Sequence, residues 1–392
     1  MSLRVRYYGP FAMKTGFSRA MNDYLCALES VGCELDIRVL GSEADTENLE
    51  EHYQHLANYC SELLPDNNPR QAKDWPEVVI VHAPPRWCHE FVTTDLAPPS
   101  GVKRVALTVW ETNKLPQEDA QHLKEHFDLV VVPTEFNRSS FIEAGIPYEQ
   151  LAVVPHAYSQ VVWGRELPPQ PKHGAYVFYA ALAWVERKNP IGLLKAYLTE
   201  FTSKDDVVLR ILTPDKDSTK HDVACLIRSI GLTDLPRVEF ITQRLSGDEL
   251  LAFHGTAHCY VSLTRGEGWN LGTFEAALVG NPVISTNWSG QREYLKDYAG
   301  FHPVGFQFTP AISPEQVLQE PLKFAGLTIT PVGRIAPLGI AGDQYWAEPD
   351  LRQAKGLMRE AYARRLGRGK PLGESRFTYE SVGKSFLEAL ER

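Results

Sequence analysis

The sequence lacks the features of a membrane-spanning, disulfide-rich or zinc-binding protein. No apolar run approaches the roughly 20 residues that a membrane helix requires. Its six cysteines are scattered, without a CxxC pair or a His/Cys cluster of zinc spacing, as is typical of reduced thiols. The opening MSLRVRYYGP has no basic start or long apolar middle of a secretory signal. We therefore expect a cytoplasmic protein, with peripheral binding at a membrane left open.

The chain also lacks an overall positive charge. Its net charge of -9 argues against a general polyanion binder, because nucleic-acid-binding domains usually carry an excess of basic residues. Segment 352–376 is the exception, with a local balance of +6. It is either a solvated helix face followed by a loop, or a docking surface for an anionic acceptor or an anionic surface. Its basic residues are Arg352, Lys355, Arg359, Arg364, Arg365, Arg368, Lys370 and Arg376.

The length of 392 residues exceeds what one hydrophobic core usually supports, so we expect two domains. In the first part of the chain, short β-rich runs alternate with segments of helical periodicity such as 17–31 and 117–126. That alternation predicts a parallel α/β sheet. The expected strands are 3–8, 34–40, 78–81, 104–109, 129–132 and 151–154.

A proline-rich break, ELPPQPKHG at 166–174, separates this part from a second alternation. We predict two tandem Rossmann-like domains, 1–165 and 173–375, that face each other across a cleft. The segment 376–392 is expected to be an amphipathic helix. In the second domain we expect strands at 176–181, 207–212, 238–241, 260–263 and 282–285, and helices near 188–201, 220–230 and 270–279.

The segment TRGEGWNLGTFE, at 264–275, follows the strand-like CYVSL and opens an apolar helix. Its glycines allow a backbone to approach a ligand closely, and its helix start favours phosphate. Glu267 and Glu275 would lie about 12 Å apart along the helix direction. This separation suits two points on one elongated ligand better than an acid and base on one bond, which stand about 5 Å apart in retaining glycosidases. Alternatively, Glu267 caps the helix and Glu275 is a surface residue.

Several motifs together resemble retaining glycosyltransferase family 4, which has the GT-B fold. They are RGEGWNLGTFEA with its Glu267-x7-Glu275 pattern, GNPVISTNWSGQREYL, WVERKNPIGLLKAY, VVVPTEFNRSSFIEAGI with VVPHAY, TVWETNKLP and QYWAEPD. They cover most of the chain in the expected order. The resemblance implies that the first domain faces the acceptor, the second binds the donor, and segment 376–392 crosses back to the first domain.

The resemblance also implies roles for residues of the second domain. Glu267 would contact the hydroxyls of the donor sugar, Glu275 would hold the ribose, and Lys188 would bind the pyrophosphate. Many family members have an arginine where this chain has Ala183, so a second cation must come from elsewhere, with Arg187 and Arg265 as candidates. Lys188 and Arg265 could also be ordinary surface residues. The helix start that would face the diphosphate comprises Gly268, Trp269, Asn270 and Leu271.

In the first domain, GPFAMKTGFSRAMNDYL resembles the glycine loop that faces the donor phosphates, with Gly16 allowing close approach and Gly9 helping the turn. Glu111 ends a strand at the cleft edge, where it could accept a hydrogen bond from a sugar hydroxyl or cap the next turn. His82 also ends a strand, but a lone histidine is more often structural. Whether Glu111 or His82 acts in catalysis is left open.

One further pattern, Asp215-Lys216-Asp217, matches the D-x-D metal motif of the other large glycosyltransferase fold. It lies between a predicted strand and a predicted helix, where Asp217 or Ser218 is a plausible N-cap. Two aspartates supply few of the oxygen ligands that a divalent ion needs, so we expect no metal site.

The sequence therefore predicts a retaining glycosyltransferase that moves a sugar from a nucleotide-diphosphate donor to an acceptor hydroxyl, without a cofactor. A UDP-sugar is the default donor, on family frequency alone. The acceptor is expected to be a glycan or a lipid-linked carrier, with hydroxymethylated bases of DNA as the alternative. A non-catalytic nucleotide-sugar binding protein is a second class. A nicotinamide oxidoreductase is disfavoured because GPFAMKTGFSRA lacks the G-x-G-x-x-G spacing.

Overall fold

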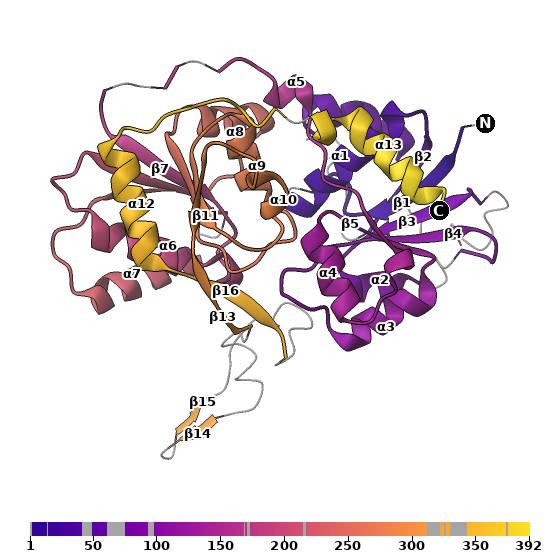
Figure 1. The fold of residues 1–392 in the computed structure, drawn as a ribbon, viewed down its shortest axis with the longest axis horizontal. Helices are drawn as coiled ribbons and strands as arrows, with labels where there is room; N and C mark the ends of the chain where they lie inside the picture. Colours follow the sequence, from indigo (N-terminus) through magenta and orange to yellow (C-terminus); the bar gives the residue numbers. More distant parts are fainter. Residues whose placement is uncertain are drawn as a thin grey trace.

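The structure is a computed structural model in which two six-stranded parallel sheets carry most of the chain (Figure 1). It describes residues 2–13, 15–40, 49–60, 75–92, 98–167, 169–170, 173–214, 217–311, 322–324, 327–329, 343–373 and 375–392. For 89–92, 217–218, 322–324 and 327–329 only the backbone is described. No helix in this described part of the chain has the length and hydropathy to cross a bilayer.

The first sheet has the strand order β2-β1-β3-β4-β5-β6, and its residues alternate between two faces as the two-residue period of a strand requires. Val5 and Ile80 face a core shared with α1 (Gly16–Ser30) and η2 (Glu51–Tyr59), whereas Tyr8 and Val79 face α2 (Pro85–Val92), α3 (Gln117–His126) and α4 (Glu135–Glu143). The strands are β1 (Arg4–Gly9), β2 (Glu34–Val39), β3 (Val78–His82), β4 (Lys103–Leu107), β5 (Leu129–Val132) and β6 (Leu151–Val153).

The second sheet has the order β12-β11-β10-β7-β8-β9 and is likewise covered on both faces. One face packs on α6 (Pro190–Glu200), α7 (Asp217–Ile230) and α12 (Leu351–Ala363), the other on α8 (Gly247–Gly255), α9 (Leu271–Leu278) and α10 (Arg292–Leu295). Its strands are β7 (Tyr176–Ala181), β8 (Val207–Leu212), β9 (Arg237–Ile241), β10 (Cys259–Ser262), β11 (Val283–Thr286) and β12 (Phe301–Val304). Most of these bounds agree with the sequence pattern to within two residues.

The chain passes between the two domains twice. Tyr158, which precedes α5 (Gln160–Trp163), and Trp163, which ends it, pack on the second domain's core. At the other end, α13 (Tyr379–Leu390) lies along α1 of the first domain (Figure 1), and its Phe386 is fully buried there. A Cβ at Gly383 would stand 2.2 Å from the carbonyl oxygen of Ala27, so the two helices touch backbone to backbone. The limits 1–165, 173–375 and 376–392 stay predictions.

An antiparallel ribbon that the sequence analysis did not predict follows the second sheet. Strand β13 (Phe306–Pro310) pairs with β16 (Tyr345–Pro349), and β14 (Leu322–Phe324) pairs with β15 (Leu327–Ile329). The ribbon reaches both domains, because the Asn113 amide donates to the carbonyl of Tyr345 (3.1 Å) and the Ala347 amide to that of Arg265 (2.8 Å). In Figure 1, β13 and β16 lie at the lower edge of the junction between the domains.

The helix expected from Lys188 begins two residues later. Lys188 ends a short 3-10 turn, η5 (Glu186–Lys188), and Asn189 has a left-handed backbone (φ 53°) and caps α6 by accepting from the Gly192 amide. This break lets Lys188 point away from the helix.

Candidate functional site

The candidate site lies where the carboxyl ends of strands from both sheets meet. Glu111 follows β4 of the first sheet, Lys188 follows β7 of the second, and Glu267 follows β10. Ligands of parallel α/β proteins bind beyond the carboxyl ends of the strands, so this is the expected position for a binding site.

Glu267 is the centre of a buried ion cluster, with only 3% of its surface exposed. Its carboxylate accepts from the Lys188 ammonium at 2.7 Å and from the Arg187 guanidinium at 2.9 Å. The Thr264 hydroxyl donates a further bond at 2.8 Å, and Arg187 also reaches Glu111 of the first domain at 3.2 Å. The alternative in which Glu267 caps α9 is wrong, because its carboxylate is engaged by these side chains instead.

These contacts favour the negatively charged form of Glu267. Burial acts to raise the pKa of its carboxyl, but Lys188 and Arg187 outweigh burial and hold the pKa below its ordinary value. Burial lowers the pKa of Lys188, and attraction to Glu267 only partly offsets that effect. The cluster therefore presents a charged carboxylate that accepts hydrogen bonds and cations that attract an anion.

Glu275 forms a second buried ion cluster and is also 3% exposed. It pairs with Arg19 on α1 of the first domain and lies 3.3 Å from Nε2 of His254, whose Nδ1 contacts the Tyr179 hydroxyl at 3.0 Å. Burial acts to raise the pKa of Glu275, and these partners lower it below the ordinary value. The alternative of a surface helix residue is thus wrong.

Arg19 and His254 were missed by the sequence analysis. A signal for Arg19 was present, because a cation in the first turn of a helix opposes the helix dipole and needs a compensating partner. His254 gave no such signal, because it lies in the last turn of α8, where a basic residue is favourable without a partner.

The glycine-rich loop permits close contact between the domains. A Cβ at Gly268 would lie 2.7 Å from Cβ of Val109, and one at Gly266 would lie 2.0 Å from the carbonyl oxygen of Glu111. A larger residue at either position would therefore push the domains apart. A Cβ at Gly16 would lie 3.5 Å from Leu271, which places the N-termini of α1 and α9 side by side.

The start of α9 has free hydrogen-bonding capacity. Asn270 at the N-cap has a left-handed backbone (φ 75°) and makes no capping bond, because its side chain donates to Ser262 at 3.1 Å instead. Trp269 is 3% exposed, and its indole nitrogen is buried without a partner. The first amides of α9 thus lack a side-chain cap, as in helix starts that bind anions.

Arg265 points away from this helix start. Its guanidinium pairs with Glu186 at 2.7 Å and with Glu348 on β16, and stacks over Trp346 at 5.7 Å. Two carboxylates already neutralise its charge, so Arg265 braces the loop against the ribbon.

His82 lies inside the first domain, 2% exposed, with Nδ1 3.0 Å from the Tyr7 hydroxyl. Burial, and then the nearby His156, lower the pKa of His82 to about 3, so its ring is neutral. This is the environment of a structural histidine.

Glu111 keeps 29% of its side chain exposed and contacts the Glu267 cluster through Arg187.

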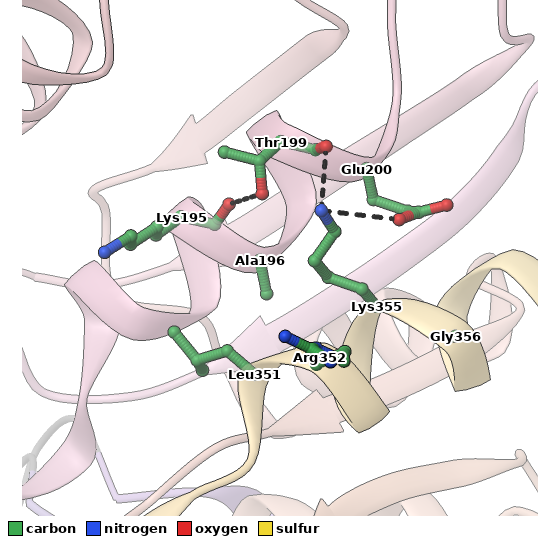
Figure 2. Close-up of a pocket in the computed structure, with 8 residues that line it drawn as sticks. All are labelled: Lys195, Ala196, Thr199, Glu200, Leu351, Arg352, Lys355 and Gly356. Atoms are coloured by element: carbon green, nitrogen blue, oxygen red, sulfur yellow. Dashed lines mark hydrogen bonds and ion pairs between the residues drawn. The ribbon is translucent and has the colours of Figure 1, made fainter.

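The basic segment 352–376 is largely engaged in contacts within the second domain. Arg359 pairs with Glu200 at 2.8 Å and with Asp205 at 2.6 Å, and Arg376 with Glu293 at 3.4 Å. Figure 2 shows a pocket of about 450 Å³ between α6 and α12, where Lys355 donates to the Thr199 carbonyl at 3.0 Å and lies near Glu200. These contacts favour a structural role for much of the segment.

The D-x-D pattern falls outside the description, because Asp215 and Lys216 are not described and Asp217 is described by its backbone alone. Elsewhere in the described ranges, no group of three or more His, Cys, Asp or Glu side chains could hold a metal ion.

Residues 174–316 match the family model described as "Glycosyl transferases group 1". No curated protein sequence matches the chain. The matched region contains Lys188, Glu267 and Glu275, together with the other second-domain residues of the two ion clusters.

Solved structures similar to this one span essentially the whole chain at low identity. Anabaena Alr3699/HepE in complex with UDP has a TM-score of 0.67 at 11% identity, covering 99% of this chain and 100% of its own. The lipopolysaccharide outer core galactosyltransferase WaaB, in its apo form, has a TM-score of 0.59 at 13% identity, covering 99% of both chains. OtsA in its apo form has a TM-score of 0.61 at 11% identity, covering 100% and 99%. With the two parallel sheets, this likeness confirms the predicted GT-B fold, and the region that matches the group 1 model lies in the second domain.

Proposed function

We propose that this protein is a retaining glycosyltransferase of family 4, which transfers a sugar from a nucleotide-diphosphate donor to an acceptor hydroxyl. The observation that carries the proposal is the buried contact of Glu267 with Lys188 and Arg187. It joins a carboxylate that can accept hydrogen bonds from sugar hydroxyls to cations that can hold a diphosphate, within the matched region.

The donor would extend between the two ion clusters. Its ribose hydroxyls would donate to Glu275, and its sugar hydroxyls to Glu267. The diphosphate would lie near Lys188 and the uncapped amides of α9. Arg19 is a better candidate than Arg265 for the second phosphate cation, because it lies in the first turn of α1, whose first residue Gly16 is beside Leu271, and its partner Glu275 would be taken over by the ribose.

A uridine diphosphate sugar is the proposed donor. HepE, similar in fold, has been solved with UDP and with UDP-glucose. At 10–11% identity this likeness concerns the fold, so the base and the sugar remain the first properties to measure.

The chemistry requires no side-chain nucleophile. The leaving diphosphate accepts the proton of the incoming hydroxyl on the same face of the sugar, and Lys188 and Arg19 stabilise the charge that develops on that diphosphate. The close contacts of Gly266 with the Glu111 backbone and of Gly268 with the Val109 side chain exclude water when the domains meet, which protects the activated sugar from hydrolysis. No metal takes part in this scheme.

The acceptor is proposed to be a glycan or glycolipid, reached from the cytoplasm, where the enzyme could sit at a membrane surface. Transfer to hydroxymethylated bases of DNA is less well supported, because the chain is acidic and much of its basic segment is engaged internally. The second class, a non-catalytic nucleotide-sugar binding protein, is also less well supported. Such a protein would be expected to lack the buried cluster of Glu267 and Lys188, where the sugar and the diphosphate would meet.

The test is nucleotide release from a panel of UDP-, GDP- and ADP-sugars. We expect one donor to be turned over by the wild type, with the anomeric configuration retained in the product by NMR. Glu267→Gln should lower turnover by about 100-fold or more, while Glu388→Gln, an exposed glutamate on α13, should not. Turnover of no donor, or equal turnover by Glu267→Gln, would overturn the proposal.

A further inference from the structure

A row of hydrogen-bonded side chains runs behind Glu275, from the segment that connects the domains to the carboxylate. We call its members, Gln170, Asn281, Tyr179 and His254, the buried network. Successive members are 3.0, 2.7 and 3.0 Å apart, and His254 lies 3.3 Å from Glu275. Asn281, Tyr179 and His254 are fully buried, so their polar atoms depend on one another rather than on water.

Backbone carbonyls fix the direction of the hydrogen bonds at the far end of the buried network. The Gln170 amide nitrogen donates to the carbonyl of Ala257 and to Oδ1 of Asn281. Nδ2 of Asn281 lies 2.7 Å from the carbonyl of His254, which can only accept, so this atom must be a donor. Its second hydrogen therefore points to the Tyr179 oxygen, also at 2.7 Å.

The same reasoning places the hydrogen on the His254 ring. The Tyr179 oxygen already accepts from Asn281, and its other partner among the described residues is Nδ1 of His254. The buried Tyr179 hydroxyl must therefore donate to Nδ1. At the other end, the lowered pKa of Glu275 keeps its carboxylate charged and able only to accept, so Nε2 of His254 carries a hydrogen. Both ends require the same neutral ring, protonated on Nε2.

The two oxygens of Glu275 therefore have different kinds of partner. Oε2 accepts from His254 of its own domain, whereas Oε1 contacts Arg19 of the first domain. The His254 ring is packed between Trp163, edge-on at 5.6 Å, and Tyr260, stacked at 6.1 Å, so it cannot turn without displacing them. A ribose can replace Arg19 at Oε1 while Oε2 stays bound to His254.

We propose that His254 is a positioning residue that holds Glu275 in the orientation needed to accept the ribose hydroxyls, and that it thereby determines the preference for a ribonucleotide over its dideoxy form. This inference rests on the proposed function, in which Glu275 binds the ribose. A carboxylate that is already oriented gains more from each hydroxyl, because little freedom is lost when the ligand binds. Arg19 cannot have this role, since the ribose would displace it.

The test measures nucleotide affinities by isothermal titration calorimetry for wild type, His254→Met and His254→Gln. UDP, GDP and ADP are each compared with their 2′,3′-dideoxy forms. The wild type should prefer one ribonucleotide over its dideoxy form by about tenfold or more, the effect of losing hydrogen bonds to a charged acceptor. His254→Met, which fills a similar space but donates no hydrogen bond, should reduce this preference to about twofold. His254→Gln, whose amide can donate in place of Nε2, should keep most of it.

The ratio of the two affinities separates positioning from packing. A packing defect weakens the ribonucleotide and its dideoxy form alike and leaves their ratio unchanged. His258→Met is the matched control, because His258 is also a buried histidine of the second domain, but its Nδ1 accepts from the Val177 amide at 3.0 Å. It should keep the wild-type ratio.

A second measurement needs no substitution that removes the donor. Nitrogen-15 NMR of the imidazole, assigned by the signal that is lost in His254→Gln, should show hydrogen on Nε2 and none on Nδ1. This pattern should persist when the nucleotide binds, because Oε2 of Glu275 stays bound to His254. Hydrogen on Nδ1, or loss of the Nε2 hydrogen with nucleotide bound, would overturn the inference even if His254→Met fails to fold.

The remaining outcomes distinguish this inference from the proposed function. If His254→Met keeps the wild-type preference for the ribonucleotide, the inference is wrong while the donor site stands. If the wild type binds both forms equally, Glu275 does not hold the ribose and the inference fails with that assignment, whereas donor turnover still tests the Glu267 cluster. If no nucleotide binds the wild type, the proposed function itself fails.

Discussion

The two glutamates of the 264–275 segment have the same burial but are linked to the first domain in different ways. Glu267 is held by Lys188 and Arg187 of its own domain, and Arg187 alone carries the link onward to Glu111. Glu275 pairs directly with Arg19 of the first domain. A ligand at Glu267 can therefore bind without breaking a direct ion pair between domains, whereas a ligand at Glu275 must compete with Arg19.

This difference suggests that the two glutamates have different roles. The Glu267 cluster is preorganised within one domain, as a site that stabilises developing charge should be. The Glu275 cluster instead couples binding to the contact between the domains. The following predictions test whether the two clusters differ in this way, beginning with the largest expected effect.

Lys188→Ala should reduce the rate of donor turnover by about 1,000-fold, because it removes the cation next to Glu267. Steady-state kinetics with the donor identified in the release assay measures the effect. Lys195→Ala, on the exposed side of α6, is the control and should behave as wild type. A loss below tenfold would remove Lys188 from the diphosphate site.

Arg19→Ala should lower the free energy of unfolding by about 3 kcal/mol, because it leaves the buried Glu275 carboxylate without its main partner. Urea unfolding measures this change. The double variant Arg19→Ala/Glu275→Gln should be more stable than the sum of the two single effects predicts. Strict additivity would show that the two side chains do not interact in solution.

Asp23, one turn after Arg19 on α1, tests the pH dependence of the same helix. It accepts bonds from Tyr53 and Tyr379 at 2.7 Å, and burial raises its pKa to about 7, from about 3.9 when unfolded. The folded protein therefore keeps a proton that the unfolded chain loses, and this contribution to stability declines as the pH rises from about 4 to 7.

Asp23→Asn should remove that decline and make the protein about 2 kcal/mol more stable than wild type at pH 8. Urea unfolding at pH 5 and pH 8 measures it. Equal pH dependence in the two proteins would show that Asp23 titrates normally.

Arg265→Ala should have the smallest effect. Its ion pairs with Glu186 and Glu348 are partly exposed, so we expect a loss of about 1 kcal/mol in stability and less than a twofold change in nucleotide affinity. Isothermal titration calorimetry measures the affinity, with Arg19→Ala as the contrasting variant. A tenfold loss would return Arg265 to the diphosphate site.

The sequence predicted the parallel sheets because buried strands and amphipathic helices leave strong periodic patterns, and the resemblance of its motifs to family 4 implied the GT-B fold. It also singled out segment 264–275, in which Glu267 lies in the loop and Glu275 on α9. It did not identify Arg19, whose only local signal is a cation in the first turn of a helix, or His254, which has no local signal for its contact with Glu275. The ribbon of β13 and β16 was missed because its strands are separated by more than thirty residues, and a non-local pairing has no turn signal.

The most direct measurement compares the affinities of a nucleoside diphosphate and of its sugar conjugate, by calorimetry, for wild type, Glu275→Gln and Glu267→Gln. UDP, GDP and ADP are screened first. The account predicts that Glu275→Gln weakens both ligands by about tenfold or more, whereas Glu267→Gln leaves the diphosphate unchanged and removes only the additional affinity of the sugar conjugate. If the two substitutions weaken both ligands equally, or if neither changes any affinity, the assignment of ribose to Glu275 and sugar to Glu267 is contradicted.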